Sequence, residues 1–142
     1  MTKILFVCHG NICRSPMAEF VLKDLVRKAG RAGEFEIASV AVSREELGNP
    51  IYPPAQRELN RRGVSFDRRA ARQITEGDLQ HFDHIYYMDR SNARYLRSMF
   101  GSKADKCRPL LSRDVADPWY TGDFSQTWED ILDGCQRILE EL

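Results

Sequence analysis

The chain has 142 residues, and its 21 Lys and Arg balance its 21 Asp and Glu, so the formal net charge is zero. This balance excludes proteins that bind nucleic acid or acidic membranes through an overall positive charge. No apolar run approaches the length of a membrane span, and the N-terminus lacks the pattern of a signal peptide, so we expect a cytoplasmic protein. The length suits a single domain, residues 1–142, with a sizeable core.

The first predicted elements flank one loop. Residues 4–7 form a short apolar, β-prone run, which predicts a buried strand. Ser15 is a favoured N-cap and Pro16 a favoured first helical residue, so a helix is predicted over residues 16–29. The loop between them ends at a helix N-terminus, where unpaired N–H groups and the helix dipole favour an anion.

The rest of the chain alternates between strand and helix patterns. In chain order we predict a strand at 35–42, a short capped turn at Ser43 with Glu46, a helix at 55–62, a helix start at Thr75 with Asp78, a strand at 85–88, a helix at 91–100, a strand at 107–111 and a helix at 124–142. This alternation predicts an α/β three-layer sandwich with a central four-stranded parallel sheet and helices on both faces. Ligands of such folds bind at the carboxyl ends of the strands, where Cys8 lies.

The loop itself has the composition of an oxyanion site. Five residues separate Cys8 from Arg14, which is enough chain to surround one tetrahedral dianion with inward backbone N–H groups. Gly10 and Asn11 tolerate the unusual backbone angles that such a curve needs, and the Arg14 fork matches two phosphate oxygens. The N–H dipoles and Arg14 would stabilise a Cys8 thiolate, which could attack phosphorus. The predicted phosphate-binding loop comprises His9, Gly10, Asn11, Ile12, Cys13, Arg14 and Ser15.

Expulsion of the leaving-group oxygen from phosphorus also needs a proton donor. Asp117 is a candidate, since Pro118 stiffens its loop and the following Trp119 and Tyr120 offer aromatic walls for a substrate ring. By spacing alone an Asp-Pro pair is more often a simple turn. The alternative donors are Asp89, Asp114 and Asp123.

Residues 8–16, Cys-His-Gly-Asn-Ile-Cys-Arg-Ser-Pro, closely resemble the signature Cys-x-Gly-Asn-x-Cys-Arg-Ser-Pro of the low-molecular-weight protein tyrosine phosphatases. The resemblance extends along the whole chain in length and in the late Asp-Pro-aromatic motif. It implies a phosphoric monoester hydrolase that acts on phosphotyrosine and small aryl phosphates through a phosphocysteine. Cys8 would be the nucleophile, Arg14 would bind phosphate, and Asp117 would be the general acid and base.

The resemblance carries further expectations. Cys13 would be a redox partner that forms a reversible disulfide with Cys8. Ser15 would hydrogen-bond Cys8 and favour its thiolate as a leaving group. No metal or other cofactor is expected, because four cysteines and three scattered histidines make neither a disulfide framework nor a metal cluster. The expected partners are phosphotyrosine-containing proteins and inorganic phosphate or other oxyanions, without nucleic acid or membrane, for a monomer or weak dimer.

Two positions depart from the family pattern. Glu45 occupies the place where the family usually carries an aromatic residue at the pocket mouth, which predicts a missing or charged cleft wall. Arg69 replaces a histidine that commonly precedes the segment here formed by residues 70–73, so support of the loop is expected to differ.

Three other functions remain open. An arsenate reductase of the same fold would need two further cysteines in residues 82–89, which contain none. Protein-arginine phosphatases tend to have Thr where this chain has Ile12, and an apolar, bulky Ile12 suits an aromatic ring better than a guanidinium. A phosphotyrosine-binding module without catalysis would lack either the nucleophile or the acid.

Overall fold

One parallel sheet forms the centre of the protein. The computed structural model describes all residues, 1–142, and its strands follow the order β2-β1-β3-β4. The strands are β1 (Thr2–Cys8), β2 (Phe35–Ala41), β3 (His84–Tyr87) and β4 (Cys107–Pro109). Successive strands lie on opposite sides of β1, so the winding reverses at the carboxyl end of β1, which is where open α/β sheets bind ligands.

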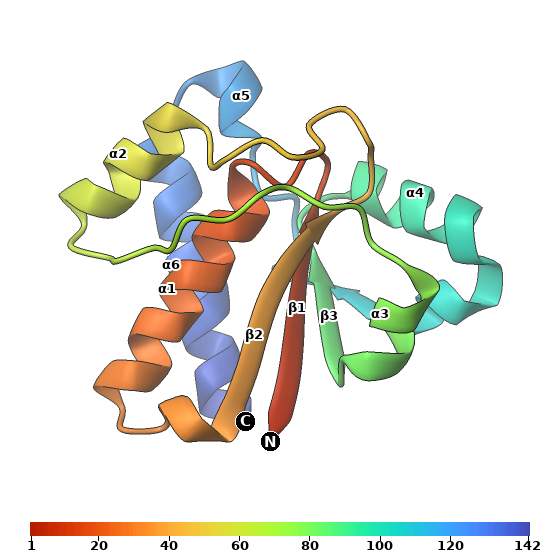
Figure 1. Ribbon diagram of the computed structural model, residues 1–142, viewed down its shortest axis with the longest axis horizontal. Coiled ribbons are helices and arrows are strands. Elements are labelled where there is room, and N and C mark those ends of the chain that lie inside the picture. The colour runs from red at the N-terminus through yellow and green to blue at the C-terminus, as the bar shows by residue number, and fades with distance from the viewer.

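Helices cover both faces of the sheet. They are α1 (Arg14–Lys28), α2 (Pro53–Arg61), α3 (Glu76–His81), α4 (Arg90–Phe100), α5 (Pro118–Thr121) and α6 (Phe124–Glu141), with 3-10 turns at η1 (Ala32–Glu34) and η2 (Gly101–Lys106). Figure 1 shows α1, α2 and α6 on one face and α3 and α4 on the other. The predicted three-layer sandwich with four parallel strands is therefore confirmed.

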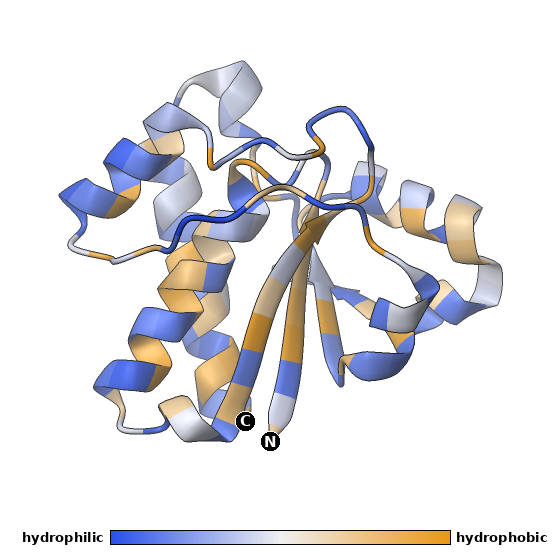
Figure 2. Ribbon diagram, in the orientation of Figure 1, coloured by the Kyte–Doolittle hydropathy of each residue, from blue (hydrophilic) through white to orange (hydrophobic).

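Alternation along β1 produces the two cores. Ile4, Phe6 and Cys8 belong to the larger buried cluster with α1 and α6, whereas Leu5 and Val7 belong to the smaller cluster on the side of α3 and α4. Both faces of the strand are apolar because helices cover both, and Figure 2 shows the apolar bands on the strands and on the inner sides of the helices. Each fully buried aliphatic side chain of this kind contributes roughly 1.5–3 kcal/mol.

Local capping signals were correct at one helix and wrong at another. Thr75 and Asp78 form the predicted capping box of α3. Ser15 was predicted as the N-cap of the first helix of the chain. It instead lies inside that helix, α1, which begins at Arg14 with Cys13 at its N-cap. The Ser15 hydroxyl contacts the Cys8 sulfur, accepts from the Asn11 Nδ2 and lies 3.3 Å from the Val40 carbonyl oxygen, so hydrogen bonds within the loop and to β2 outweigh its local capping preference.

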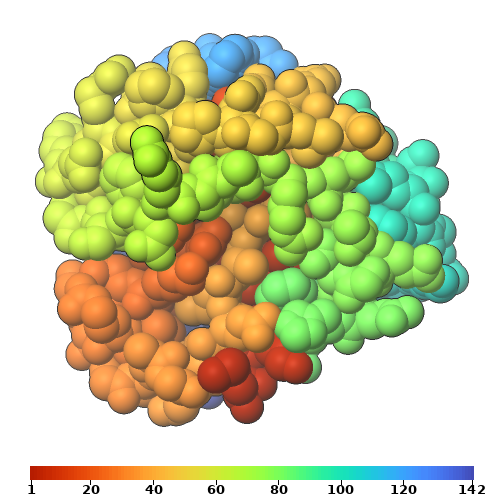
Figure 3. All heavy atoms as spheres, in the orientation of Figure 1, coloured from red at the N-terminus to blue at the C-terminus, as the bar shows by residue number.

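Two loops lie over the carboxyl end of β2. Residues 43–48, predicted as a short capped turn, form bends and turns in which the Ser43 Oγ accepts a hydrogen bond from the Glu45 N–H. The segment between α2 and α3 crosses the face in Figure 3 and pairs with Ala41 through Gln73. This crossing brings Arg69 to the loop that follows β1. No helix is long and apolar enough to span a membrane.

Candidate active site

The loop from Cys8 to Arg14 curves around the end of β1. Asn11 adopts a left-handed conformation with φ of 60°, the one non-glycine residue with positive φ. This conformation directs the Asn11 N–H at the Cys8 Sγ, at 3.3 Å. A Cβ at Gly10 would lie 3.2 Å from the Glu46 Cγ, so a side chain there would press on the neighbouring loop. The unusual backbone angle predicted for both positions is therefore found at Asn11 alone, and Gly10 does not have a positive φ.

Asn11 is fully buried and ties the loop to its surroundings. Its Nδ2 donates to the Ser15 Oγ at 2.8 Å and to the Ser39 Oγ at 3.0 Å. Arg69 donates to the Asn11 carbonyl oxygen at 2.9 Å and to its Oδ1. Burial lowers the pKa of Arg69, although Glu19 and Cys8 oppose this. Arg69 thus supports the loop from outside, through the backbone and the side chain of Asn11.

The Cys8 sulfur also contacts Ser15. The Sγ and the Ser15 Oγ lie 3.0 Å apart, and either atom can be the donor. The same Oγ is 3.3 Å from the Val40 carbonyl oxygen. Ser15 thus places a hydroxyl within hydrogen-bond distance of the sulfur.

Arg14 is 2% exposed and is held by three oxygens. Its Nη1 donates to the Asp89 Oδ2 and to the Val115 carbonyl, both at 2.8 Å, and its Nη2 lies 3.4 Å from the Asp117 Oδ2. Burial acts to lower the pKa of Arg14, but the negative charges of Cys8, Asp117 and Asp89 outweigh burial and raise it. The guanidinium is therefore a fixed cation beside the sulfur.

Four aspartates were candidates for the acid, and only one of them lines the pocket. Asp117 caps α5, where its Oδ1 accepts from the Trp119 N–H at 3.0 Å and its Oδ2 faces Arg14. Asp89 is tied to Arg14, Asp114 pairs with Arg90, and Asp123 caps α6.

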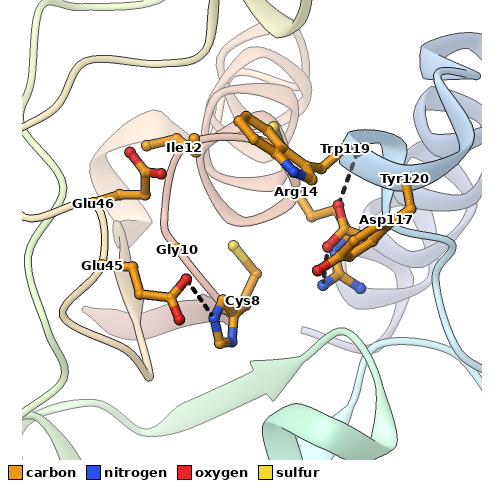
Figure 4. Close-up of a pocket in the computed structure, with 11 residues that line it drawn as sticks. Cys8, Gly10, Ile12, Arg14, Glu45, Glu46, Asp117, Trp119 and Tyr120 are labelled. Atoms are coloured by element: carbon orange, nitrogen blue, oxygen red, sulfur yellow. Dashed lines mark hydrogen bonds and ion pairs between the residues drawn. The ribbon is translucent and has the colours of Figure 1, made fainter.

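The pocket has two unlike walls. In Figure 4, Ile12, Glu45 and Glu46 lie on one side, Trp119 and Tyr120 lie on the other, and Cys8 lies between them. The pocket encloses about 130 Å³, less than the roughly 300–1,000 Å³ of typical small-molecule sites. It accordingly has room for the head of a ligand, while the remainder stays outside.

Each wall of the pocket makes a contact with a neighbouring side chain. Glu45, predicted as a cleft wall, lies 3.1 Å from the His9 Nε2 at the rim. The Trp119 ring packs against Tyr52, with ring centroids 4.8 Å apart. Tyr52 also contacts Phe124, so the aromatic wall continues to the start of α6.

All four cysteines are free thiols in buried positions. Burial raises the pKa of Cys13, and the neighbouring Cys8 and Asp117 charges raise it further. Burial also raises the pKa of Cys107 to about 11 and raises the pKa of Cys135, as expected for thiols that pack in the core. No group of three or more His, Cys, Asp or Glu side chains is placed to hold a metal ion.

The sequence did not identify several residues that hold the site together. Asp89 was considered only as an acid, and Val115, Ser39 and Tyr52 were not singled out. A local signal existed for Asp89, since Asp89 and Asn92 follow the third predicted strand with the spacing of a capping box. Val115 acts through its backbone carbonyl, for which side-chain patterns carry no signal.

Comparison with known proteins gives one consistent family. A family model described as low molecular weight phosphotyrosine protein phosphatase matches residues 3–142. The low molecular weight protein-tyrosine-phosphatase YfkJ of Bacillus subtilis (strain 168) is 42% identical over 150 residues, covering 100% of this chain and 96% of the relative. Its crystal structure matches with a TM-score of 0.95, covering 99% of this chain and 94% of that chain.

Two further crystal structures are similar to this chain. SP-PTP, a low molecular weight protein tyrosine phosphatase from Streptococcus pyogenes, has a TM-score of 0.93 at 40% identity, covering 100% of this chain and 93% of that one. DARP, the drosophila arginine phosphatase, has a TM-score of 0.88 at 31% identity, covering 99% of this chain and 97% of that chain. The chain therefore belongs to the low molecular weight phosphotyrosine protein phosphatase family, as the motif at residues 8–16 predicted.

Proposed function

We propose that this protein is a protein tyrosine phosphatase that hydrolyses phosphotyrosine and small aryl phosphates through a phosphocysteine intermediate. One observation carries the proposal: Cys8, Arg14 and Asp117 line the same small pocket, with a backbone N–H and a hydroxyl on the sulfur and a buried guanidinium beside it. This is the set of a nucleophile, an anion-binding group and a proton donor that in-line phosphoryl transfer needs.

In the first step the Cys8 thiolate attacks phosphorus. The S–P bond forms as the bond between phosphorus and the tyrosine oxygen breaks, and Asp117 gives its proton to that oxygen. Arg14 and the loop amides bind the equatorial oxygens, where charge spreads in the transition state.

In the second step water attacks the phosphocysteine. Asp117, now a carboxylate, takes a proton from the water as the new O–P bond forms and the S–P bond breaks. Inorganic phosphate leaves, and the sulfur returns as a thiolate that Ser15, 3.0 Å away, can stabilise with its hydroxyl.

The pocket walls favour an aromatic phosphomonoester. Trp119 is 52% exposed at the rim and can stack on a ring, while Ile12 offers an apolar surface opposite. A protein-arginine phosphatase is the second candidate, since the arginine phosphatase from drosophila is 31% identical and Glu45 and Glu46 could face a guanidinium. The apolar, bulky Ile12 favours the tyrosine substrate.

The same site supports a thiol switch. Cys13 follows Cys8 by five residues in the same loop and lines the same pocket. When a peroxide oxidises Cys8 to a sulfenic acid, the Cys13 sulfur can attack it, forming a disulfide and releasing water. Four free thiols fit the reducing cytoplasm, and the substrates would be phosphotyrosine-containing proteins there.

Turnover of three substrates tests the proposal. The wild-type protein should hydrolyse a phosphotyrosine peptide much faster than a phosphoarginine peptide and should not reduce arsenate. Cys8→Ser should abolish turnover, and Asp117→Ala should slow aryl phosphate hydrolysis by about 10²–10⁴-fold. Rapid acid quench during turnover should trap phosphate on Cys8. Failure to find a phosphocysteine, or full activity of Cys8→Ser, would refute the mechanism.

A further inference from the structure

Asn92, in the first turn of α4, is a fully buried polar residue that does not line the pocket. Its Oδ1 accepts from the Met88 N–H at 3.0 Å and from the Asp89 N–H at 3.3 Å. Its Nδ2 has no hydrogen-bond partner on the protein. Asn92 therefore acts through its oxygen, which holds the turn between β3 and α4.

This turn carries one of the two oxygens that hold the Arg14 Nη1. The Asp89 Oδ2 accepts from Nη1 at 2.8 Å, while the Asp89 Oδ1 accepts from the Asn92 N–H at 2.8 Å. The Asp89 Oδ2 thus binds Arg14, while the Asp89 Oδ1 binds the backbone N–H of Asn92.

The other oxygen on the Arg14 Nη1 depends on the same turn. The Met88 carbonyl accepts from the Val115 N–H at 2.8 Å, and the Val115 carbonyl accepts from the Arg14 Nη1, also at 2.8 Å. Since the Asn92 Oδ1 accepts from both the Met88 N–H and the Asp89 N–H, two chains of hydrogen bonds lead from the Asn92 side chain to Arg14, one through Met88 and Val115 and one through Asp89.

We propose that Asn92 is a positioning residue for Arg14 and, through it, for the bound phosphate. It touches neither the substrate nor the guanidinium, but it fixes both oxygens that orient Nη1. Small displacements of a charged group that binds the transferring phosphoryl group have large effects on rate. Capping of α4 alone does not account for Asn92, because its Oδ1 also accepts from the Met88 N–H at 3.0 Å, a contact outside the capping box.

The chain contains a matched control for this role. Thr75 and Asp78 form a capping box at α3 by the same local pattern, but neither residue contacts Arg14 or lines the pocket. Thr75→Val removes that cap, and Asn92→Leu removes the Asn92 acceptor while keeping the number and branching of side-chain heavy atoms. Both variants should lower the melting temperature, whereas only Asn92→Leu should change the binding of phosphate.

The inference rests on the proposed function only for its kinetic readout, so binding of inorganic phosphate is measured first, by calorimetry at a temperature where every variant is folded. We expect Asn92→Leu to raise the Kd of phosphate and the KM for an aryl phosphate by about tenfold, with Thr75→Val unchanged. If Asn92→Leu does not fold, Asn92→Ser, whose hydroxyl keeps one acceptor, should show an intermediate Kd.

A double variant separates positioning from general stability. In the Asp89→Ala background one of the two chains is already broken, so adding Asn92→Leu should raise the Kd of phosphate by less than about threefold. A wild-type Kd in either Asn92 variant, or effects of Asp89→Ala and Asn92→Leu that simply multiply, would overturn the inference. A wild-type protein that binds no phosphate would instead refute the proposed function.

Discussion

The floor and the rim of the pocket are built in opposite ways. Arg14 lines the floor and is 2% exposed, while Asn11 and Ser15, both predicted in the phosphate-binding loop, do not line the pocket and are fully buried beneath it. Each of the three is held by hydrogen bonds from more than one segment. At the rim, Tyr120 is 84% exposed and the side chain of Glu45 is 69% exposed. The chemistry is thus fixed by a buried network, while contacts with the substrate depend on exposed side chains that can change without disturbing the fold.

The floor should tolerate no change in the geometry of its cation. Arg14→Lys keeps the charge but loses the planar fork that binds Asp89, Val115 and phosphate oxygens together. We expect kcat for an aryl phosphate to fall by roughly 10²–10³-fold. Steady-state kinetics measure this, with the exposed Arg57→Lys as a control that should behave as wild type. A loss of less than tenfold would mean that the charge alone is sufficient.

The second thiol on the floor should determine recovery from oxidation. After brief peroxide treatment, the wild-type protein should regain activity with a thiol reductant, while Cys13→Ser should lose most of its activity permanently. Because burial raises the pKa of Cys13 and the thiolate is the attacking form, disulfide formation should become faster as pH rises.

The control for this oxidation experiment is Cys107→Ser. Cys107 is a buried thiol on β4 that does not line the pocket, and its replacement should leave recovery unchanged. Equal recovery of Cys13→Ser and the wild-type protein would exclude the proposed thiol pair.

The aromatic side of the rim should affect binding rather than chemistry. Trp119→Ala removes a ring that packs on Tyr52 and faces the pocket. We expect KM for aryl phosphates to rise about three- to tenfold, since aromatic contacts contribute about 0.5–1.5 kcal/mol, with kcat nearly unchanged. An alkyl phosphate should show no such increase. A large drop in kcat would instead show that Trp119 positions Asp117.

The acidic side of the rim should have the smallest effect. Glu45 and Glu46 make this wall negative, so peptides with a Lys beside the phosphotyrosine should be favoured over peptides with a Glu there. Glu45→Gln should reduce this ratio of kcat/KM values by about two- to fivefold, because exposed charge pairs contribute about 0.2–1 kcal/mol. The preference should also weaken at high salt. If Glu45→Gln leaves this ratio of kcat/KM values unchanged, Glu45 does not contribute to the choice between the two peptides.

The two regions also differ in how far the sequence predicts them. The four strands and every helix except α5 followed from local patterns, because periodicity and capping residues are properties of short segments. Residues 118–121, predicted to lie in a loop, form the short helix α5. The loop from Cys8 to Arg14 was predicted as an anion site because its residues are contiguous. Asp117 needed the family resemblance, since an Asp-Pro pair has no local feature that distinguishes an acid from a turn.

Ser15 shows where local reasoning failed. Ser followed by Pro is a good helix start in isolation. In the folded chain Asn11 donates to the Ser15 hydroxyl and Cys8 contacts it, and α1 begins two residues earlier than predicted, at Arg14, with Cys13 as its N-cap. A hydrogen bond to a buried partner outweighs one that water can replace.

The sequence by itself determined the fold class and the contiguous loop from Cys8 to Arg14, because both depend on residues close together along the chain. Only the tertiary structure decided what holds Arg14, since Asp89, Val115 and Asp117 are separated from it by 75, 101 and 103 residues. Those partners meet because parallel strands place their carboxyl ends at one edge of the sheet. No local pattern encodes that proximity.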